Sequence, residues 1–399
     1  MGLASNPSGA AMQKVSFTPQ FDDGNGWYNI LPSAPPAREL EGDQKADWLV
    51  IGAGFSGLAA ARRLAEHFPD QRIALIDADR VGRGTSGRNA GFAIDVPFLQ
   101  ESQNDLERGR RIFSLSKAGV DELERLVNEH GIECQWSNRG KYMVAVSQQK
   151  QRVLEQTQDF LLAIGAQSQV LGKDALRERL GTGHYEMGLF SPGTCLMNPA
   201  ALTRGLASSL PENVDLYENS PIIEARLHSD ILAKTAKASI AAKGVIMATN
   251  GFSETFGVLP HRHFNIMSFV SLTRPLSTPE QTELLGGAQD WGVHPVGASG
   301  ATIRRTQDNR IWHRVGFVYP YKNRSSEALL RRFRRAHIKD FKTRFPQLGE
   351  PDFEHTYGGL LCMSRNTEPL FQKIGDNAFI VGCQNGIGVA KGTIHGRLI

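Results

Sequence analysis

Three glycines in the stretch "DWLVIGAGFSGLAAARRL" have the spacing that holds a phosphate against bare main chain. Gly52 permits a tight turn after a strand, Gly54 lets the backbone approach a pyrophosphate, and Gly57 lets a helix pack closely on that strand. Amide groups at the N-terminus of such a helix, together with the helix dipole, attract negative phosphates. The spacing therefore predicts a dinucleotide site. The other predicted contacts of this turn are Ala53, Phe55 and Ser56.

The elements that position these glycines form a strand, helix and strand unit. The apolar run "WLVIG" predicts a buried strand, small and apolar residues in "AAARRLAEHF" recur at helical spacing, and Pro69 ends the helix. A second apolar run, "RIALIDAD", contains Asp77, 20 positions after Gly57. A carboxylate at the tip of the second strand can accept hydrogen bonds from ribose hydroxyls, so Asp77 and Ala78 are predicted nucleotide contacts.

A glycine-rich loop follows the second strand. The segment "RVGRGTSGRNAGF" has four glycines between positions 82 and 91. Such a loop lets main chain lie flat on a large planar ligand or wrap phosphate oxygens, with Ser86, Arg88 and Asn89 as donors. A mobile surface loop is the alternative. Nicotinamide and flavin cofactors share an ADP half, so the glycine motif alone fits both, and the loop favours a large planar cofactor.

With this loop included, the sequence resembles the D-amino-acid-oxidase-type FAD-dependent oxidoreductases, in particular the branch that contains γ-glutamylputrescine oxidase. Similar segments are "MNPAALTRGLA", "KGVIMATNGF", "SFVSLTRPLS", "IRRTQDNRIWH", "YGGLLCMSRNTEPLF" and "AFIVGCQNGIGVAKGTIHGRL". The resemblance implies an α/β fold in which a Rossmann-like FAD-binding domain joins an α+β substrate domain with a mainly antiparallel sheet.

The resemblance also implies an FAD site assembled from distant parts of the chain. Its further contacts are Gly84, Thr85, Ala90, Gly91, Ile222, Thr249, Asn250, Gly251, Cys362, Gly382, Asn385, Gly386, Ile387 and Gly388. The last of these form a strand-to-helix turn that meets the pyrimidine end of the flavin, where main-chain amides offer partial positive charge. The histidine usual in that turn is Ile387 here, so only the main-chain role is expected.

Two cysteines in the C-terminal part of the chain are candidates for a covalent bond to the flavin. Cys362 takes the place of the cysteine that sarcosine oxidase links covalently to the flavin, and a nearby cation can make a thiol reactive. The favoured alternative is a buried cysteine that acts as a small hydrophobe beside a non-covalent flavin. Cys383 is a second, weaker candidate. Lys391 is given no substrate role, because the register places the family's lysine at Ala390.

The implied reaction is the oxidation of a C–N bond. Flavin N5 takes a hydride from a carbon that bears nitrogen, and water hydrolyses the resulting imine. A protonated amine has no lone pair to drive the transfer, so the substrate must bind neutral or lose its proton in the site. Placement of the C–H bond in an apolar pocket can suffice without a dedicated base. The expected partners are a small-molecule amine or amino acid, and oxygen or another electron acceptor.

Three residues are predicted to contact the substrate. Arg304 is expected to bind a carboxylate, because a guanidinium matches a carboxylate with two hydrogen bonds. Tyr319 and His263 are expected to form walls or to handle protons. A structural role is the alternative for each of the three. His313 and Arg314 are consecutive on one predicted strand, so only one of them can face inward.

Length and composition bound the class of protein. A chain of 399 residues is long enough for two lobes. Lys and Arg exceed Asp and Glu by only four, which does not indicate a nucleic-acid partner. No apolar run approaches the ~18 residues of a transmembrane segment, and the N-terminus lacks a secretory pattern. Four scattered cysteines form no CxxC pair, which predicts no metal site, no disulfide framework and a cytoplasmic location.

The predicted organisation has an N-terminal arm and two domains. The arm takes residues 1–45. The FAD-binding domain takes 46–99, 190–255 and 346–399, and the substrate domain takes 100–189 and 256–345. The segment "LLRRFRRAHIKDFKTRF" predicts an amphipathic helix whose arginines face solvent, with docking to an anionic partner or lipid surface as the alternative.

The sequence leaves three functions open. The first is an FAD-dependent oxidase of amines or amino acids that uses oxygen. The second is a dehydrogenase of the same fold that passes electrons to a quinone or protein carrier. The third is a protein that binds FAD without turning over amines. Reduction of the flavin by an amine, and the speed of reoxidation in air, separate the three.

Overall fold

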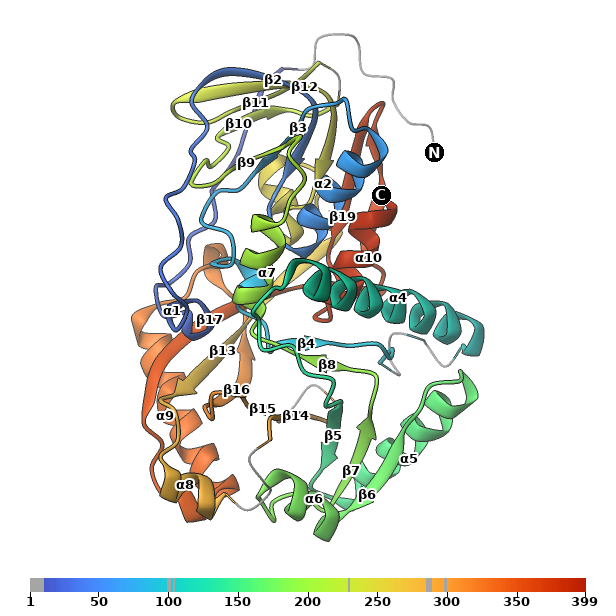
Figure 1. Ribbon diagram of the computed structural model, residues 1–399, viewed down its shortest axis with the longest axis vertical. Coiled ribbons are helices and arrows are strands. Elements are labelled where there is room, and N and C mark those ends of the chain that lie inside the picture. The colour runs from blue at the N-terminus through green and yellow to red at the C-terminus, as the bar shows by residue number, and fades with distance from the viewer. Residues whose placement is uncertain (1–10, 99–101, 103–104, 229, 285–288, 298–299) are drawn as a thin grey trace.

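Two β-sheets, at opposite ends of the molecule, organise the chain (Figure 1). The computed structural model describes residues 11–98, 102, 105–228, 230–284, 289–297 and 300–399. Within these residues the first sheet has nine strands and the second has eight. A short ribbon of β4 (Phe92–Ala93) and β8 (Cys195–Leu196) forms a third, two-stranded sheet.

The first sheet has a parallel centre, as a dinucleotide-binding fold requires. β12, β2, β3 and β9 are parallel neighbours, and β19 runs parallel to the C-terminal half of β12. The central apolar runs are buried, because helices and strands cover both faces of this sheet. The strands are β1 (Gln13–Lys14), β2 (Gly42–Ile51), β3 (Ile73–Ile76), β9 (Val214–Tyr217), β10 (Glu224–Arg226), β11 (Ile231–Lys234), β12 (Ala238–Met247), β18 (Leu370–Gly375) and β19 (Ala378–Gly382).

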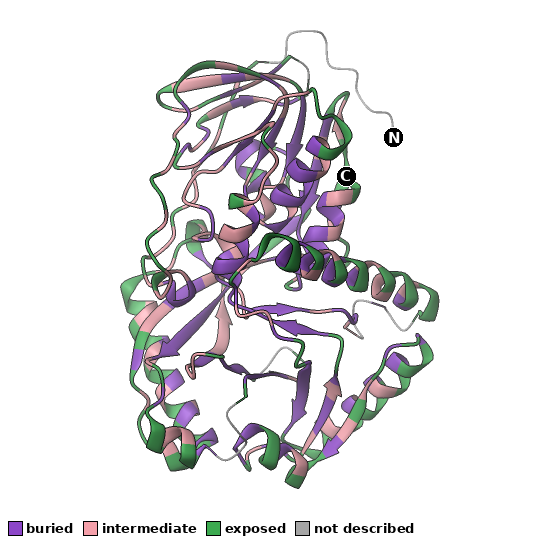
Figure 2. Cartoon of the chain, viewed as in Figure 1, coloured by how far each residue is buried: buried purple, intermediate pink, exposed green. Residues whose placement is uncertain are grey.

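Four helices pack on one face of this sheet. They are α2 (Phe55–His67), α4 (Leu106–His130), α7 (Pro199–Ser208) and α10 (Ala390–Leu398). The Asn198 side chain begins α7 by accepting hydrogen bonds from the amides of Ala200 and Ala201, and Gly131, at φ +59°, ends α4. Figure 2 shows buried residues concentrated in the strands and in α2, whereas α4 carries many exposed residues.

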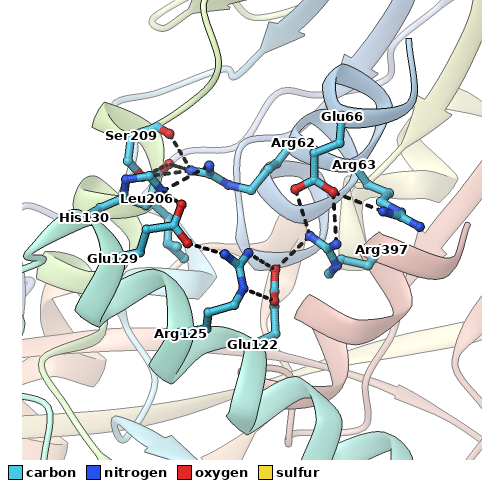
Figure 3. A network of polar contacts seen from close by, with 10 residues as sticks. All are labelled: Arg62, Arg63, Glu66, Glu122, Arg125, Glu129, His130, Leu206, Ser209 and Arg397. Atoms are coloured by element: carbon cyan, nitrogen blue, oxygen red, sulfur yellow. Dashed lines mark hydrogen bonds and ion pairs between the residues drawn. The ribbon is translucent and has the colours of Figure 1, made fainter. Parts of the chain in front are cut away.

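A network of ion pairs and hydrogen bonds joins these four helices (Figure 3). The Arg397 guanidinium of α10 contacts Glu66 of α2 at 3.0 Å and Glu122 of α4 at 2.7 Å. Arg62 of α2 donates to the carbonyl oxygen of Ser209, just after α7, at 2.6 Å. Because α10 follows the predicted flavin turn, this network fixes that turn against the helix that begins at the glycine motif.

The second sheet is mainly antiparallel and has the order β17, β13, β16, β15, β14, β5, β7, β6, in which only β14 and β5 pair in parallel among the described residues. Its strands are β5 (Lys141–Ala145), β6 (Gln169–Gly172), β7 (Met187–Ser191), β13 (His263–Thr273), β14 (Trp291–Pro295), β15 (Ala301–Arg305), β16 (Ile311–Val318) and β17 (Phe353–Ser364). Its helices are α5 (Gln148–Ala163), α6 (Lys173–Leu180), α8 (Thr278–Glu283) and α9 (Glu327–Arg344). The short elements are α1 (Gly26–Asn29) and the 3-10 turns η1 (Thr85–Gly87), η2 (Asn250–Phe256), η3 (Tyr321–Asn323) and η4 (Pro346–Leu348).

The basic helix α9 packs on the second sheet through an apolar stripe. Phe333, His337 and Phe341 are buried, whereas Arg331 and Arg335 are exposed. This is the amphipathic arrangement that the sequence predicts. In the described part of the chain, no helix is long and apolar enough to cross a membrane.

Three segments lie differently from their predicted places. β17 pairs along its length with β13, so residues 353–364 belong to the second sheet, not to the first. α4 contributes Val120 and Leu123 to the core under the first sheet, although the prediction puts residues 100–189 in the other domain. The predicted arm is built into the fold, since β1 pairs with β10. Residues 1–10 of that arm lie outside the described residues.

Candidate active site

The glycine motif forms the turn between β2 and α2. Gly52 has φ +103°, and a Cβ there would lie 2.7 Å from the carbonyl oxygen of Ala248. A Cβ at Gly57 would lie 1.8 Å from the carbonyl oxygen of Gly52, so only glycine lets α2 begin this close to the strand. Gly54 precedes the first residue of the helix. The amides of the turn are therefore at the N-terminus of α2, where partial positive charge favours a phosphate.

Asp77 lies directly after β3 and faces the same turn. One carboxylate oxygen accepts a hydrogen bond from the amide of Ala53 at 2.7 Å, and the other accepts from the amide of Asp79 at 3.0 Å. Burial raises the pKa of Asp77 to about 6, against these two hydrogen bonds. Each oxygen keeps a lone pair for a further donor, such as a ribose hydroxyl.

The glycine-rich loop is ordered by its own polar side chains, which differs from their predicted use as ligand donors. Ser86 Oγ accepts a hydrogen bond from the amide of Phe55 at 3.1 Å, and Asn89 bonds to the main chain of Ser86 and Gly91. The guanidinium of Arg88 is nearly fully buried. These side chains position the loop, and its main chain remains for a cofactor.

Arg88 connects the loop to two distant segments. Its Nη1 contacts the carboxylate of Asp22 in the N-terminal arm at 3.0 Å and the carbonyl oxygen of Gly358 in β17 at 2.9 Å. Asp22 in turn accepts hydrogen bonds from the Ser325 hydroxyl at 2.7 Å and from the Gly358 amide at 3.0 Å. The buried guanidinium is thus paired and hydrogen-bonded inside the protein, so Arg88 is a structural residue of the site.

One cavity of about 770 Å³ runs from the glycine turn to the second sheet. It is lined by the predicted FAD contacts except Gly57, Gly91 and Gly251. Gly57 is the packing glycine described above. Gly91, at φ +68°, would place a Cβ 2.2 Å from the carbonyl oxygen of Met197, and Gly251 packs on Asn265. These three glycines do not line the cavity; they allow close packing of the segments that form its walls.

The strand-to-helix turn after β19 has the left-handed backbone that its role requires. Cys383, Asn385 and Gly386 have φ of 52°, 52° and 85°. Two asparagine side chains support it: Asn250 accepts from the amide of Cys383 at 2.9 Å, and Asn385 accepts from the amide of Ser364 at 2.8 Å. The turn therefore presents main chain and the apolar side chain of Ile387 to the cavity.

The three residues predicted to contact the substrate do not line the cavity, and the predicted role of Arg304 as a carboxylate-binding residue needs correction. Its side chain is buried, and its Nη1 donates to the carbonyl oxygens of Gly91 at 2.6 Å and Met197 at 2.7 Å. Arg304 therefore holds the end of the glycine-rich loop in place. Tyr319 is 80% exposed on the surface. His263 is buried, with its Nδ1 4.0 Å from a carboxylate oxygen of Glu254.

Other residues of the second sheet take the place of these three. Thr302 on β15 pairs in register with Arg314 on β16, and both line the cavity. His313 faces the opposite side of the sheet, where Nε2 lies 2.7 Å from Asp340. Strand alternation predicts that only one of His313 and Arg314 faces inward, and the structure shows that it is Arg314. The apolar wall comprises Phe92, Ile94, Phe98, Met143, Val153, Val296, Trp312 and Phe317.

Next to this apolar wall, Lys141 and His294 form a buried pair. Lys141 Nζ lies 3.0 Å from Nε2 of His294, and His294 lines the cavity. Burial lowers the pKa of Lys141 to about 8, with Asp95 opposing the shift. Burial, and then the charge of Lys141, lower the pKa of His294 well below its usual 6.5. His294 is therefore neutral at physiological pH.

The lowered pKa of Lys141 makes the free energy of unfolding depend on pH. Between pH 8 and 10.5 the folded state binds fewer protons at Lys141 than the unfolded state does, so stability rises with pH. Relative to Lys141→Met, the wild type is expected to gain about 2 to 3 kcal/mol of unfolding free energy between about pH 7 and pH 10. Urea unfolding of both proteins at the two pH values measures it. A relative loss would mean that the electrostatic attraction of Asp95 outweighs burial.

Cys362 lines the cavity and hydrogen-bonds with the thiol of Cys383. That contact, together with burial, raises the pKa of Cys362 far above the usual range of a thiol, and the same hydrogen bond lowers the pKa of Cys383. Flavin attachment needs a thiolate. The thiol that faces the cavity is the protonated one.

Together, the parallel sheet with its glycine turn, the antiparallel sheet and the cavity that joins them define an FAD-dependent oxidoreductase fold. The residues fit the cofactor: bare main chain meets the diphosphate position, and Asp77 has acceptor capacity for a ribose. The chain belongs to the DAO family, described as FAD dependent oxidoreductase, whose model matches residues 47–399. The chain is thus an FAD-dependent oxidoreductase, and the family and fold that the sequence predicts are confirmed.

Individual relatives agree with this assignment. The chain is 26% identical to the probable oxidoreductase OrdL of Haemophilus influenzae, over 92% of this chain and 84% of that protein. It is 25% identical to gamma-glutamylputrescine oxidoreductase of Escherichia coli, over 88% of this chain and 82% of that protein. Its fold is similar to that of glycine oxidase from Geobacillus kaustophilus, with a TM-score of 0.72 and 18% identity over 88% of this chain and 93% of that one.

Proposed function

We propose that the protein oxidises the C–N bond of an amine, amino acid or imino acid, with hydride transfer to flavin N5 and hydrolysis of the imine product. The observation that carries the proposal is the single cavity that joins the glycine turn to an apolar chamber on the second sheet. A flavin bound in this cavity would supply the hydride acceptor. The names of the relatives, a gamma-glutamylputrescine oxidoreductase and a glycine oxidase, support the same class of substrate.

The residues of this chain would bind and orient the substrate. The apolar wall excludes water and favours the neutral amine, because a charged ammonium is costly to bury without a partner. His294 is neutral and lines the cavity as an uncharged ring, because its Nε2 accepts from Lys141 Nζ at 3.0 Å and its Nδ1 faces the carbonyl oxygen of Pro295 at 3.3 Å. The protonated thiol of Cys362 supports a non-covalent flavin.

Anaerobic reduction of the flavin tests the proposal. The holoprotein is mixed with D-amino acids, N-methyl amino acids, cyclic imino acids and polyamines, and the visible absorbance of the flavin is followed. At least one class is expected to bleach it and to release ammonia or an amine. If no compound bleaches it, the protein binds FAD without amine turnover. Reoxidation in air within seconds would support an oxidase, and reoxidation over minutes would favour a dehydrogenase with another acceptor.

A further inference from the structure

Arg314 is a partly buried cation with an unfilled hydrogen-bonding position at the substrate end of the cavity. Its Nη2 donates to Thr302 Oγ1 at 2.6 Å, and its guanidinium lies 4.8 Å from the centre of the Phe317 ring. Its Nη1 is buried and has no hydrogen-bond partner among the described residues. Burial lowers the pKa of Arg314 to about 10, so the side chain stays charged at physiological pH.

Two other buried arginines of the chain are paired with carboxylates. Arg88 pairs with Asp22 at 3.0 Å, and Arg344 pairs with Asp340 at 2.6 Å. Arg304 donates through Nη1 to carbonyl oxygens at 2.6 and 2.7 Å; its Nε has no partner among the described residues, but Arg304 does not line the cavity. A buried guanidinium without such partners is costly, so an anion supplied from outside the chain would stabilise Arg314.

The charges around the cavity are asymmetric. Among the described residues that line it, Asp77 is the one carboxylate, and it lies at the nucleotide end beside the glycine turn. Arg80 also lines the cavity, but it is paired with Glu218 at 3.2 Å. The substrate end therefore holds the charge of Arg314, with the charge of Lys141 behind His294, and no lining carboxylate there faces a second ammonium group.

We propose that Arg314, supported by Thr302, binds a carboxylate of the substrate, so that the enzyme acts on amino or imino acids and not on simple polyamines. This inference rests on the proposed oxidation of a C–N bond. The carboxylate accepts from Nη1 and anchors one end of the substrate. The carbon skeleton then lies against the apolar wall, which includes Phe98, Met143 and Val153. A polyamine would bring a further ammonium group toward Arg314 and gain no partner.

Binding of a carboxylate that cannot be oxidised tests the inference without turnover. Benzoate and its neutral analogue benzamide are titrated into the oxidised holoprotein by calorimetry. Benzoate is expected to bind and benzamide to bind at least about 10-fold more weakly. Arg314→Met is expected to weaken benzoate binding by about 10- to 100-fold, and Arg314→Lys by less, because lysine keeps the charge and loses the planar fork. Arg335→Met, on the exposed side of α9, is the matched control.

The outcomes separate the inference from the proposed function. Flavin content and thermal unfolding show whether each variant is folded. Equal binding of benzoate by wild type and folded Arg314→Met, or flavin reduction by polyamines and by no amino or imino acid, overturns the inference and leaves the C–N oxidation standing. If benzoate binding depends on Arg314 while no amine or amino acid reduces the flavin, the anion site is supported and the proposed function fails.

Discussion

Asp77→Ala is expected to weaken FAD binding by about 10- to 100-fold, because a carboxylate that accepts hydrogen bonds from ribose hydroxyls contributes about 1.5 to 3 kcal/mol. The variant also leaves the amides of Ala53 and Asp79 without their acceptor. Asp77→Asn keeps the shape and one acceptor oxygen, so its loss is expected to be smaller. Titration of the apoprotein with FAD, followed by quenching of the flavin fluorescence, measures all three affinities.

The pH dependence gives this prediction a second readout. Since burial raises the pKa of Asp77 to about 6, FAD affinity is expected to fall as the pH drops through 6 in the wild type, and to fall less in Asp77→Asn. Asp70→Asn, at an exposed turn after α2, is the control. Wild-type affinity for FAD in a folded Asp77→Ala protein would contradict the proposed ribose contact.

Gly57→Ala is expected to lower the free energy of unfolding by about 3 kcal/mol or more, and to reduce the flavin content with it. Alanine favours a helix over glycine by about 1 kcal/mol, so helix propensity alone would predict stabilisation. The added Cβ, however, would lie 1.8 Å from the carbonyl oxygen of Gly52, and this main-chain atom cannot move without displacing the turn. The steric clash therefore outweighs the gain in helix propensity, and Gly57→Ala is expected to destabilise the protein.

Chemical denaturation and the ratio of flavin to protein absorbance test the glycine prediction. Gly183→Ala is the matched control, because a Cβ at that position meets no atom within 4 Å and its backbone is not left-handed. It is expected to leave stability within about 0.5 kcal/mol of the wild type. If Gly57→Ala were as stable as this control, α2 would not pack on β2 as closely as the structure shows.

The nucleotide end of the site could be predicted because its determinants are local. The glycine spacing, the two apolar strands and Asp77 lie within one short stretch, and its conformation follows from the chain itself. The hairpin between β15 and β16 is similar, since Asn309 adopts the left-handed backbone, with φ +59°, that its place at the turn indicates.

The substrate end could not be predicted in the same way, because it depends on which distant groups meet. Arg304 and Arg314 lie on neighbouring strands. Arg304 donates to the carbonyl oxygens of Gly91 and Met197, whereas Arg314 lines the cavity. Similarly, β17 continues directly from α9 and η4 in the sequence, and only its pairing with β13 shows to which sheet it belongs.

The bond between Asp22 and Arg88 has a practical consequence for truncation. The family match begins at residue 47, and a shortened protein that starts there would lack Asp22. A buried guanidinium would then lose its counter-charge, at a cost of about 3 to 5 kcal/mol, although no residue of the glycine motif had been removed. We expect such a trimmed protein to retain less FAD through purification than the full chain, so recombinant versions should keep the leading segment at least from Asp22.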